Sequence, residues 1–476
     1  MARSLTARAL SLSIVLVSGV STHGPFTPHV PPQAPPRVPP VGVFLDAGGS
    51  DEAAATRALA IITPAWKDGY AAMFIDMARL LPPRRRGDQL LVHPVRTRLL
   101  TFLGQRTGQR FGDDLAAWRD WLWNRPYDPH PDYAAFKAAV YSSVDPTMRE
   151  FFTAAKSVIR LDEVDWGGVP VNGIPPLDQP RSIPAADASY LRDSHIVFGV
   201  VVAGRARAYP KRILAWHEMA LDQLGGEDLT VVYCTLCGTV IPYKSVVGGT
   251  KRQFGTSGLL YRANKLMFDR ETMSLWSTLD GRPVVGALAG QPLTLEAFPV
   301  VTTTWGEWKE QHPQTTVLSI ETGYDRDYGE GVAYREYFDS DRLMFRVPRP
   351  DTRLKNKAEV LGVLVPAVGG GRQAAAFSAD FLARTRVHHE TLEGRTFVVL
   401  TSPKGANRVH DVGAVTIRRW VSDTIVADAA GRRWVVTEDA LMPEASRSAS
   451  ALPRVPAFRA FWFGWHAQFP ETLLVK

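Results

Sequence analysis

The only two cysteines of the 476-residue chain, Cys234 and Cys237, are two residues apart and are followed by Gly238. The apolar run LTVVY precedes them and the run TVIPY follows them. Residues 239–242 are three β-branched residues and a proline, which begin helices poorly. The pattern therefore predicts a tight turn between two strands, with Gly238 in a backbone conformation that larger residues avoid.

Such a turn would direct both sulfur atoms to one side, as in half of a tetrahedral metal site. Because there is no third cysteine, further ligands would be His, Asp or Glu side chains, a partner chain or a substrate. His217 in the string AWHEM is the best third ligand and His195 the second, and for each the alternative is a structural histidine. Thiolate and imidazole ligands suit zinc, iron or copper. The other readings of the Cys234–Cys237 pair are a stabilising short-loop disulfide and inert buried thiols.

The N-terminus has the layout of a secretory signal peptide over residues 1–24, with two arginines before an apolar stretch. An uncleaved membrane anchor is the alternative, because no clear cleavage site stands out. Residues 25–50 begin with a Pro-rich stretch and are predicted to be an extended linker. The expected location is the periplasm or the extracellular space, where the two cysteines can pair with each other.

The charge of the chain argues for solubility rather than nucleic-acid binding. The formal net charge is +7, and loss of Arg3 and Arg8 with the leader leaves +5, spread along the chain. We expect an unknown small-molecule or envelope ligand, no nucleic acid, and membrane attachment only through an uncleaved leader.

The length suggests two or three domains, and the predicted fold class is α+β, mainly β. Residues 51–156 read as a helical domain, in which Gly112-Asp113-Asp114 offers a helix start before an apolar face of Leu115, Trp118 and Leu122. Short runs rich in Val, Ile, Tyr and Phe then alternate with turn residues. We predict a β-rich lobe with the cysteines over 157–345, a Cys-less β-rich lobe over 346–445 and a C-terminal tail over 446–476.

The two lobes are predicted to be related by an internal duplication. The stretch from IVFGVVVAG to VVYCTLCG has a counterpart in EVLGVLVPAVGGG to FVVLTSPKG. In this alignment His217-Glu218 corresponds to His389-Glu390. Thr401 and Ser402 occupy the place of Cys234 and its neighbour.

A second polar segment follows the cysteines in the string FGTSGLLYRANKLMFDRETMSLW. Its pocket candidates are Ser257, Tyr261, Arg262, Asn264, Asp269, Arg270 and Trp276. The alternative is a β-hairpin with an ion pair elsewhere, because adjacent residues on a strand point to opposite faces. The chain has no phosphate-binding glycine loop and no Gly-x-Ser-x-Gly elbow.

These strings, together with GIPPL, resemble the bacterial domain-of-unknown-function family 3179. The shared motifs are Tyr-Cys-x-Leu-Cys-Gly, Ala-Tyr-Pro, Trp-His-Glu and Ser-Gly-Leu-Leu-Tyr, which here begin at Tyr233, Ala208, Trp216 and Ser257. Thr235 stands where the family usually has proline, and Leu221 where an asparagine is common.

The resemblance implies no established activity, but it implies that the recurring polar residues form one site. That set is Cys234, Cys237, His217, Glu218, Tyr261, Asp269, Arg270 and Trp276. The first hypothesis is a metal- or thiol-dependent site, possibly of an oxidoreductase, with Cys234, Cys237, His217 and Glu218 as catalytic residues. Of these, Cys234, Cys237 and His217 would be the metal ligands. Tyr261, Asp269, Arg270 and Trp276 would line the pocket or support it.

Two other hypotheses stay open. One is a non-catalytic envelope binding module whose cysteine pair is a structural disulfide. The other, a dithiol exchange protein, is disfavoured by the missing helix after Cys237. The sequence leaves open whether the protein is an enzyme.

Overall fold

The structure, a computed structural model, describes residues 38–86, 89–445 and 450–476. Pro39–Lys476 form one compact unit. The predicted signal peptide and the linker up to residue 37 lie outside the described residues. Within the described ranges, no helix combines the length and apolar character needed to cross a membrane.

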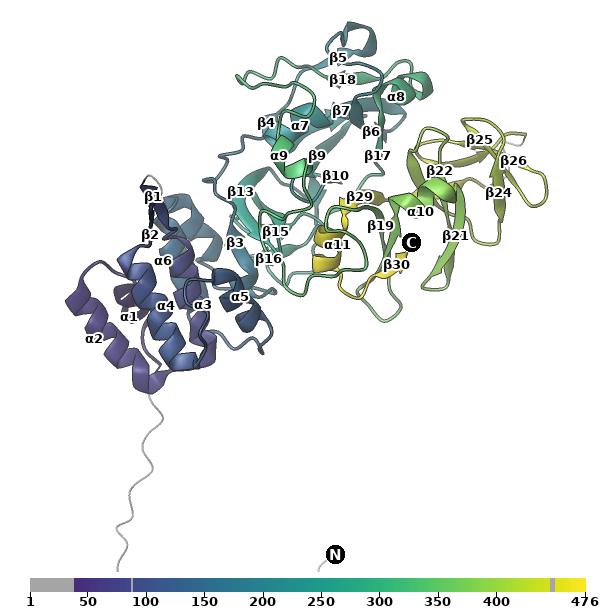
Figure 1. Cartoon of the computed structure of the whole chain (residues 1–476). Helices are drawn as coiled ribbons and strands as arrows, with labels where there is room; N and C mark the ends of the chain where they lie inside the picture. Colours follow the sequence, from purple (N-terminus) through teal and green to yellow (C-terminus); the bar gives the residue numbers. More distant parts are fainter. Residues whose placement is uncertain (1–37, 87–88, 446–449) are drawn as a thin grey trace, which may run out of the picture. The chain divides into compact units, whose positions relative to one another are not determined.

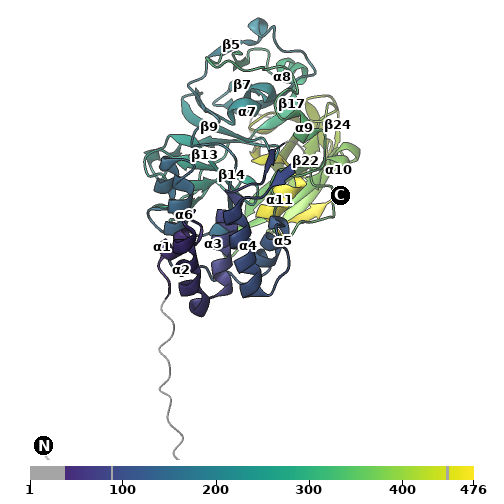
Figure 2. The same cartoon turned by 60° about the vertical axis from the view of Figure 1, so that its left-hand side comes forward.

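The N-terminal part is helical, as predicted, and carries one short hairpin (Figure 1). Its elements are α1 (Val41–Ala47), α2 (Glu52–Ile62), α3 (Ala71–Arg79), β1 (Arg84–Arg86), β2 (Gln89–Leu91), α4 (Pro94–Thr107), α5 (Leu115–Trp123) and α6 (Tyr133–Ser142). Asp114 caps α5 by accepting hydrogen bonds from the backbone of Ala116 and Ala117. The predicted apolar face of α5 is buried at Trp118 and Leu122. Helix α3 packs against α4 and α5 (Figure 2).

Buried ion pairs join this helical part to the first strand that follows it. Asp165, 1% exposed, lies 2.6 Å from a guanidinium nitrogen of Arg79 and 2.5 Å from one of Arg119. Within the helices, fully buried Lys137 pairs with Asp76 at 2.9 Å. Each buried charge is thus matched by an opposite one, as burial in a low-dielectric core requires.

The rest of the chain is β-rich, which confirms the predicted α+β class. One five-stranded antiparallel sheet has the order β16-β15-β14-β13-β3, and a second sheet has the order β10-β9-β8-β4. Their strands are β3 (Val164–Trp166), β13 (Phe254–Tyr261), β14 (Asn264–Asp269), β15 (Leu275–Ser277), β16 (Pro283–Val285), β4 (Leu177–Asp178), β8 (Met219–Leu224), β9 (Glu227–Cys234) and β10 (Thr239–Lys244).

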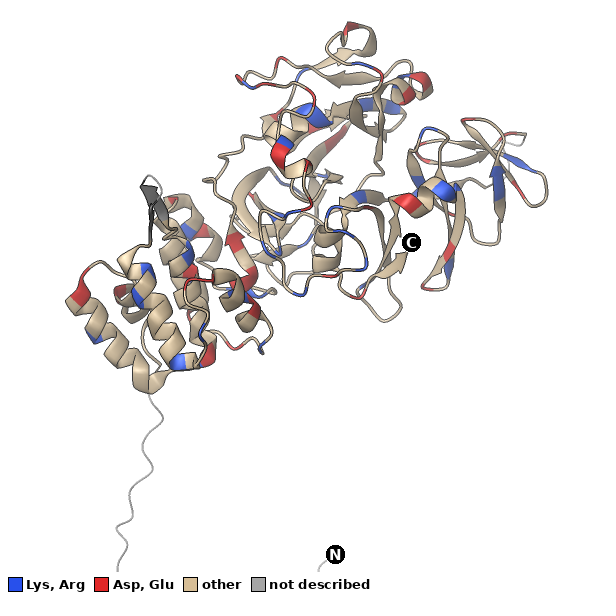
Figure 3. Cartoon of the chain, viewed as in Figure 1, with Lys and Arg blue, Asp and Glu red and all other residues tan. Residues whose placement is uncertain are grey.

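An eight-stranded sheet dominates the C-terminal region, with the order β21-β22-β23-β28-β27-β26-β25-β24. Its strands are β21 (Val387–Leu392), β22 (Arg395–Thr401), β23 (Asn407–Asp411), β24 (Ile417–Trp420), β25 (Ile425–Asp428), β26 (Arg433–Val436), β27 (Ala440–Pro443) and β28 (Leu452–Val455). Other small elements are β11 (Val246–Val247) and β12 (Thr250–Lys251), which pair with each other, and α9 (Arg335–Phe338). Basic and acidic residues are interspersed over the helical and β-rich parts (Figure 3).

Two further sheets, β17-β6-β7-β18-β5 and β29-β19-β20-β30, share the connectivity of four strands, and the first sheet has β5 as an additional strand. In each, three antiparallel strands are followed by a parallel pairing, of β7 with β18 and of β20 with β30. Their elements are β5 (Ser182–Pro184), β6 (Ile196–Val202), β7 (Arg205–Pro210), α7 (Lys211–His217), β17 (Val301–Thr304), α8 (Trp305–Gln311), β18 (Thr316–Leu318), β19 (Glu359–Pro366), β20 (Arg372–Ser378), α10 (Ala379–Arg384), β29 (Ala457–Phe461), α11 (Trp462–Gln468) and β30 (Leu473–Val475).

The two sheets also share a packing detail. A Cβ atom added to Gly199 would lie 2.2 Å from the ring of Trp308, and one added to Gly362 would lie 2.2 Å from the ring of Trp465. Each indole nitrogen donates to a threonine hydroxyl seven residues further on, at 2.8 Å from Trp308 and 2.9 Å from Trp465.

Three expectations from the sequence differ from the structure. The linker was expected to run to residue 50, but α1 begins at Val41 and buries Phe44. The tail expected over 446–476 contains β28, β29, α11 and β30, because its aromatic residues complete a sheet. His389-Glu390 lies within strand β21, whereas His217-Glu218 ends helix α7, so these two pairs do not correspond.

Candidate functional site

The Cys234–Cys237 segment is a turn between two antiparallel strands, as the sequence predicts. Cys234 at the end of β9 pairs with Thr239 at the start of β10. Gly238 has φ = 64°, in the left-handed region that favours glycine. Cys234 and Cys237 form a disulfide, with Cα atoms 5.3 Å apart.

The turn is enclosed by parts of the chain distant in sequence. Cys234 is 4% exposed and Cys237 is fully buried. The backbone N–H of Phe461 donates to the carbonyl oxygen of Cys237 at 2.7 Å, and the Tyr337 hydroxyl donates to that of Leu236 at 2.9 Å. These bonds fix both halves of the turn, and the surrounding cluster is apolar.

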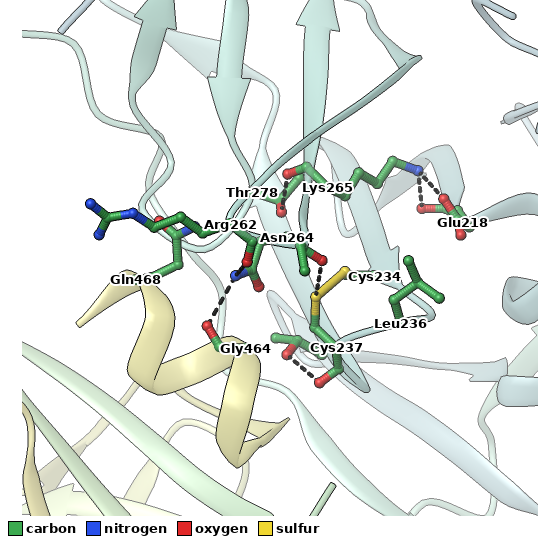
Figure 4. Close-up of a disulfide and its surroundings, with 12 residues drawn as sticks. Glu218, Cys234, Leu236, Cys237, Arg262, Asn264, Lys265, Thr278, Gly464 and Gln468 are labelled. Atoms are coloured by element: carbon green, nitrogen blue, oxygen red, sulfur yellow. Dashed lines mark hydrogen bonds and ion pairs between the residues drawn. A yellow bond between two sulfur atoms is a disulfide. The ribbon is translucent and has the colours of Figure 1, made fainter. Parts of the chain in front are cut away.

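The hairpin turn between β13 and β14 covers the disulfide from another side (Figure 4). The Sγ atom of Cys237 lies 3.4 Å from the carbonyl oxygen of Ala263. The side-chain amide of Asn264 donates to the carbonyl oxygen of Gly464 in α11 at 3.0 Å. A side chain at Gly464 would come within 3.1 Å of Cys237 Cβ, so this glycine permits the close approach of α11 to the disulfide.

A buried ion pair lies beside this turn. The Nζ atom of Lys265, the second residue of β14, is 2.8 Å from Oε2 of Glu218 and 3.4 Å from its carbonyl oxygen (Figure 4). Lys265 is 5% exposed and Glu218 is 8% exposed. Burial lowers the pKa of Lys265, and the charge of Glu218 opposes that shift.

Glu218 and Lys265 line a narrow pocket of about 50 Å³ together with Leu236, one of the two residues between the cysteines. The other lining residues are mostly apolar: Gly167, Val169, Ile174, Thr256, Gly258, Leu259, Leu260, Tyr334, Met344 and Phe345. Three of them, from Tyr334 to Phe345, belong to the 319–358 segment, which connects β18 to β19 and contains only the short helix α9. A long connection that covers a pocket is a common feature of functional sites.

Glu218 holds an unusual backbone conformation for its residue type. It follows the last residue of α7 with φ = 55°, a left-handed position at which glycine is favoured. A non-glycine residue there carries a conformational cost of about 1 kcal/mol. The glutamate at this position places a carboxylate at the helix end, within reach of Lys265. Strained backbone conformations such as that of Glu218 concentrate at functional sites.

His217 faces away from the cysteines. Its ring nitrogens lie 2.9 Å from the carbonyl oxygen of Pro175 and 2.5 Å from the Tyr328 hydroxyl, and its ring packs against Tyr324. Burial lowers the pKa of His217. In the described part of the chain, no three His, Cys, Asp or Glu residues are grouped so that they could hold a metal ion. The predicted ligands Cys234, Cys237 and His217 therefore do not come together.

Asp269 and Trp276 form a separate network. The Asp269 carboxylate is fully buried and accepts hydrogen bonds from the Trp276 indole at 2.8 Å and from Thr272 at 2.8 Å. It also pairs with Arg252 at 3.3 Å, whereas Arg270 points outward to Asp178. Asp269 and Arg270 thus form ion pairs with different partners. This is the β-hairpin arrangement that the sequence offers as the alternative to a pocket.

Tyr261 lies at the end of β13, away from the pocket. Its ring is covered by the guanidinium of Arg262, which is 5.0 Å from the ring centroid and 2.5 Å from Glu163. Of the eight residues that the family resemblance groups together, only Glu218 lines this pocket, and the two cysteines flank the turn whose Leu236 lines it. The structure adds Lys265, whose signal in the sequence was a lysine directly before the apolar run Leu266-Met267-Phe268 of a buried strand.

The fold and the site define a β-rich protein with an N-terminal helical part and a disulfide-closed turn beside a Lys–Glu pocket. The family described as "Protein of unknown function (DUF3179)" matches residues 171–472, and the chain belongs to this family. No curated protein and no solved structure matches the chain.

Proposed function

We propose that this protein works in the periplasm or outside the cell as a binding protein for a small, mainly apolar molecule. In this proposal Lys265 and Glu218 form the polar end of the pocket, and the Cys234–Cys237 disulfide is a clip that fixes one wall. The observation that carries the proposal is that Leu236, enclosed between the linked cysteines, lines the same pocket as the buried ion pair. An apolar pocket with a few convergent polar groups is the usual form of a small-molecule site.

Burial of the disulfide supports the clip over dithiol exchange. Exchange requires a thiolate to reach one of the two sulfur atoms. Cys237 is fully buried and Cys234 is 4% exposed, and Phe461 and Tyr337 bind the turn from two sides. An exported location fits both the predicted leader and a disulfide between the only two cysteines.

The metal- or thiol-dependent site remains the competing hypothesis. It would need ligands other than His217, because both ring nitrogens of that residue have partners. The polar side chains closest to the turn in the pocket are Lys265 and Glu218, and a lysine ammonium does not bind metals.

Thiol titration with elemental analysis of the purified full chain separates these hypotheses. We expect metal-free protein with no titratable thiol, native or denatured, and two thiols only after denaturation in reductant. A bound transition metal that is lost in a Cys234→Ser variant would restore the metal site. If mild reductant opens the disulfide in the folded protein, the result would support a dithiol exchange protein instead.

Ligand binding tests the pocket itself. The probe is 1-butanol, an apolar molecule with one hydroxyl, added in a thermal-unfolding series. We expect it to raise the Tm of the wild type but not of Leu236→Trp, which fills the pocket. Phe345→Ala, which widens the pocket, should accept branched alcohols that leave the wild-type Tm unchanged. Equal shifts in all three proteins would contradict the proposal.

We infer, in addition, that the two sheets of equal connectivity arose by internal duplication. The strand order, the parallel pairing and the two Gly–Trp contacts support this inference. The turn after β22 contains Ser402, whose hydroxyl donates to Glu307 in α8 at 2.6 Å. The turn after β9 contains the cysteines and packs on α11. Each turn therefore contacts the Trp-containing helix of the other repeat, and of the two only the turn after β9 carries a disulfide.

A further inference from the structure

We propose that Lys265 captures a small aliphatic aldehyde or ketone by forming a Schiff base through its Nζ atom. This inference rests on the proposed function, because it needs the pocket to admit a ligand, and it names the chemical class of that ligand. The pocket offers one amine and one carboxylate within an otherwise apolar wall. The complementary molecule has a short hydrocarbon body and a single carbonyl group.

The geometry provides the groups that the reaction requires. Schiff-base lysines are held in apolar surroundings that favour the neutral, nucleophilic amine. Lys265 has such surroundings, with Leu236 and Leu260 among the lining residues. The Glu218 carboxylate, 2.8 Å from Nζ, lies within the distance at which a general base accepts a proton.

The step balances with these two side chains alone. Glu218 takes a proton from the Lys265 ammonium, and the neutral Nζ attacks the carbonyl carbon, forming the C–N bond. The carbonyl π electrons move to oxygen, which receives a proton from nitrogen to give a neutral carbinolamine. Glu218 returns its proton to the departing hydroxyl as the C–O bond breaks, and the nitrogen lone pair forms the C=N bond. One water is released, and the resulting iminium carries the charge that the ammonium carried, next to the Glu218 carboxylate.

Lys137 provides an internal comparison. It is also buried and also pairs with a carboxylate, Asp76 at 2.9 Å. It differs in that Tyr141 and the carbonyl oxygen of Val164 also surround its Nζ atom. It does not line the pocket that contains Lys265. The two lysines therefore share burial and charge pairing, and they differ in access to a pocket.

Reductive trapping tests the proposal on the full chain. The folded protein is treated with butanal and cyanoborohydride at neutral pH, and the butylated lysines are mapped by peptide mass spectrometry. We expect Lys265 to be alkylated faster than the exposed lysines, which are protonated at this pH, while Lys137 stays unmodified. Glu218→Gln should slow the reaction at Lys265 by about a hundredfold, as loss of a general acid–base does.

Leu236→Trp keeps the lysine but fills the pocket, and it should abolish labelling of Lys265 without changing that of the exposed lysines. This variant keeps the test decisive if Glu218→Gln fails to fold. Labelling of Lys265 that is no faster than that of exposed lysines would overturn the Schiff-base inference. If 1-butanol still raises the Tm in that case, the proposed binding pocket is supported and only the Schiff base at Lys265 is contradicted. If neither probe acts, the proposed function falls as well.

Discussion

The Nζ atom of Lys265 and the Oε2 atom of Glu218 are 2.8 Å apart in the lining of a mainly apolar pocket, and both side chains are almost fully buried. Lys265 lies near the start of β14, and Glu218 directly follows helix α7. Their ion pair therefore ties the sheet that follows the helical part to the strand pair that carries the disulfide. It is both a structural link and the main polar feature of the pocket.

Removing one partner of this pair should destabilise the protein more than removing both. Lys265→Met leaves the Glu218 carboxylate buried without a counter-charge, which costs about 3 kcal/mol or more. The double variant Lys265→Met, Glu218→Leu removes both charges and should recover most of that loss. Urea unfolding of the wild type, the two single variants and the double variant gives the coupling energy. Additive losses would show that the pair is not coupled.

The pH dependence of stability should carry the signature of Lys265. Burial lowers its pKa in the folded state below the ordinary value of 10.5. At a pH between the folded-state and unfolded-state pKa of Lys265, the unfolded chain binds more protons than the folded one. Lys265 therefore makes the free energy of unfolding rise as the pH rises between these two pKa values. Urea midpoints measured from neutral pH to about pH 10.5 should show this rise in the wild type relative to Lys265→Met. A constant difference between the two proteins over that range would contradict the lowered pKa.

The turn at the cysteines offers a matched pair of threonines. Thr235 is fully buried, and its hydroxyl has no hydrogen-bond partner among the residues that the structure describes. Thr235→Val removes an unpaired polar group of similar shape and should raise the free energy of unfolding by about 1 kcal/mol. Thr239→Val is the control, because the Thr239 hydroxyl donates to the carbonyl oxygen of Cys237 at 3.2 Å and its loss should cost about 1 kcal/mol. Equal effects of the two substitutions in urea unfolding would be inconsistent with this difference.

The secondary structure around the turn was predictable because local residue types decide it. The β-branched residues and the proline after Cys237 exclude a helix, and β10 begins at Thr239. The C-terminal sheet strands were harder to predict, since β29 and β30 pair with strands about a hundred residues earlier. The repeated Trp-x-x-Trp spacing of Trp305 and Trp308 and of Trp462 and Trp465 was the available signal.

The site was only partly predictable, because neighbours in sequence separate in space. His217 and Glu218 are adjacent, yet the left-handed φ of Glu218 turns its side chain to Lys265 while His217 faces Tyr328. Sequence spacing contains no information on such a change in direction. Lys265 was missed because a lysine in a strand is usually exposed, and only tertiary packing leaves its side chain 5% exposed.

The disulfide should stabilise the fold without being needed for it. Closing so short a loop restricts the unfolded chain by about 2 kcal/mol. The double variant Cys234→Ala, Cys237→Ala should lose about that much in urea unfolding. It should also bind 1-butanol more weakly, because Leu236 is less firmly fixed. Unchanged stability in the variant would show that hydrogen bonds from Phe461 and Tyr337 hold the turn alone.

The two Gly–Trp contacts should respond alike to substitution. Gly199→Ala and Gly362→Ala each place a methyl group 2.2 Å from a fully buried indole, of Trp308 and Trp465, which cannot move without opening the core. Each variant should lose about 2 kcal/mol or more by overpacking, measured by urea unfolding. Gly42→Ala in helix α1 is the matched control, since no atom of the described residues lies within 4 Å of the added group and alanine favours the helix by about 0.5 kcal/mol or more. A loss at Gly199 without one at Gly362 would show that the two sheets, although equal in connectivity, do not depend on the same packing.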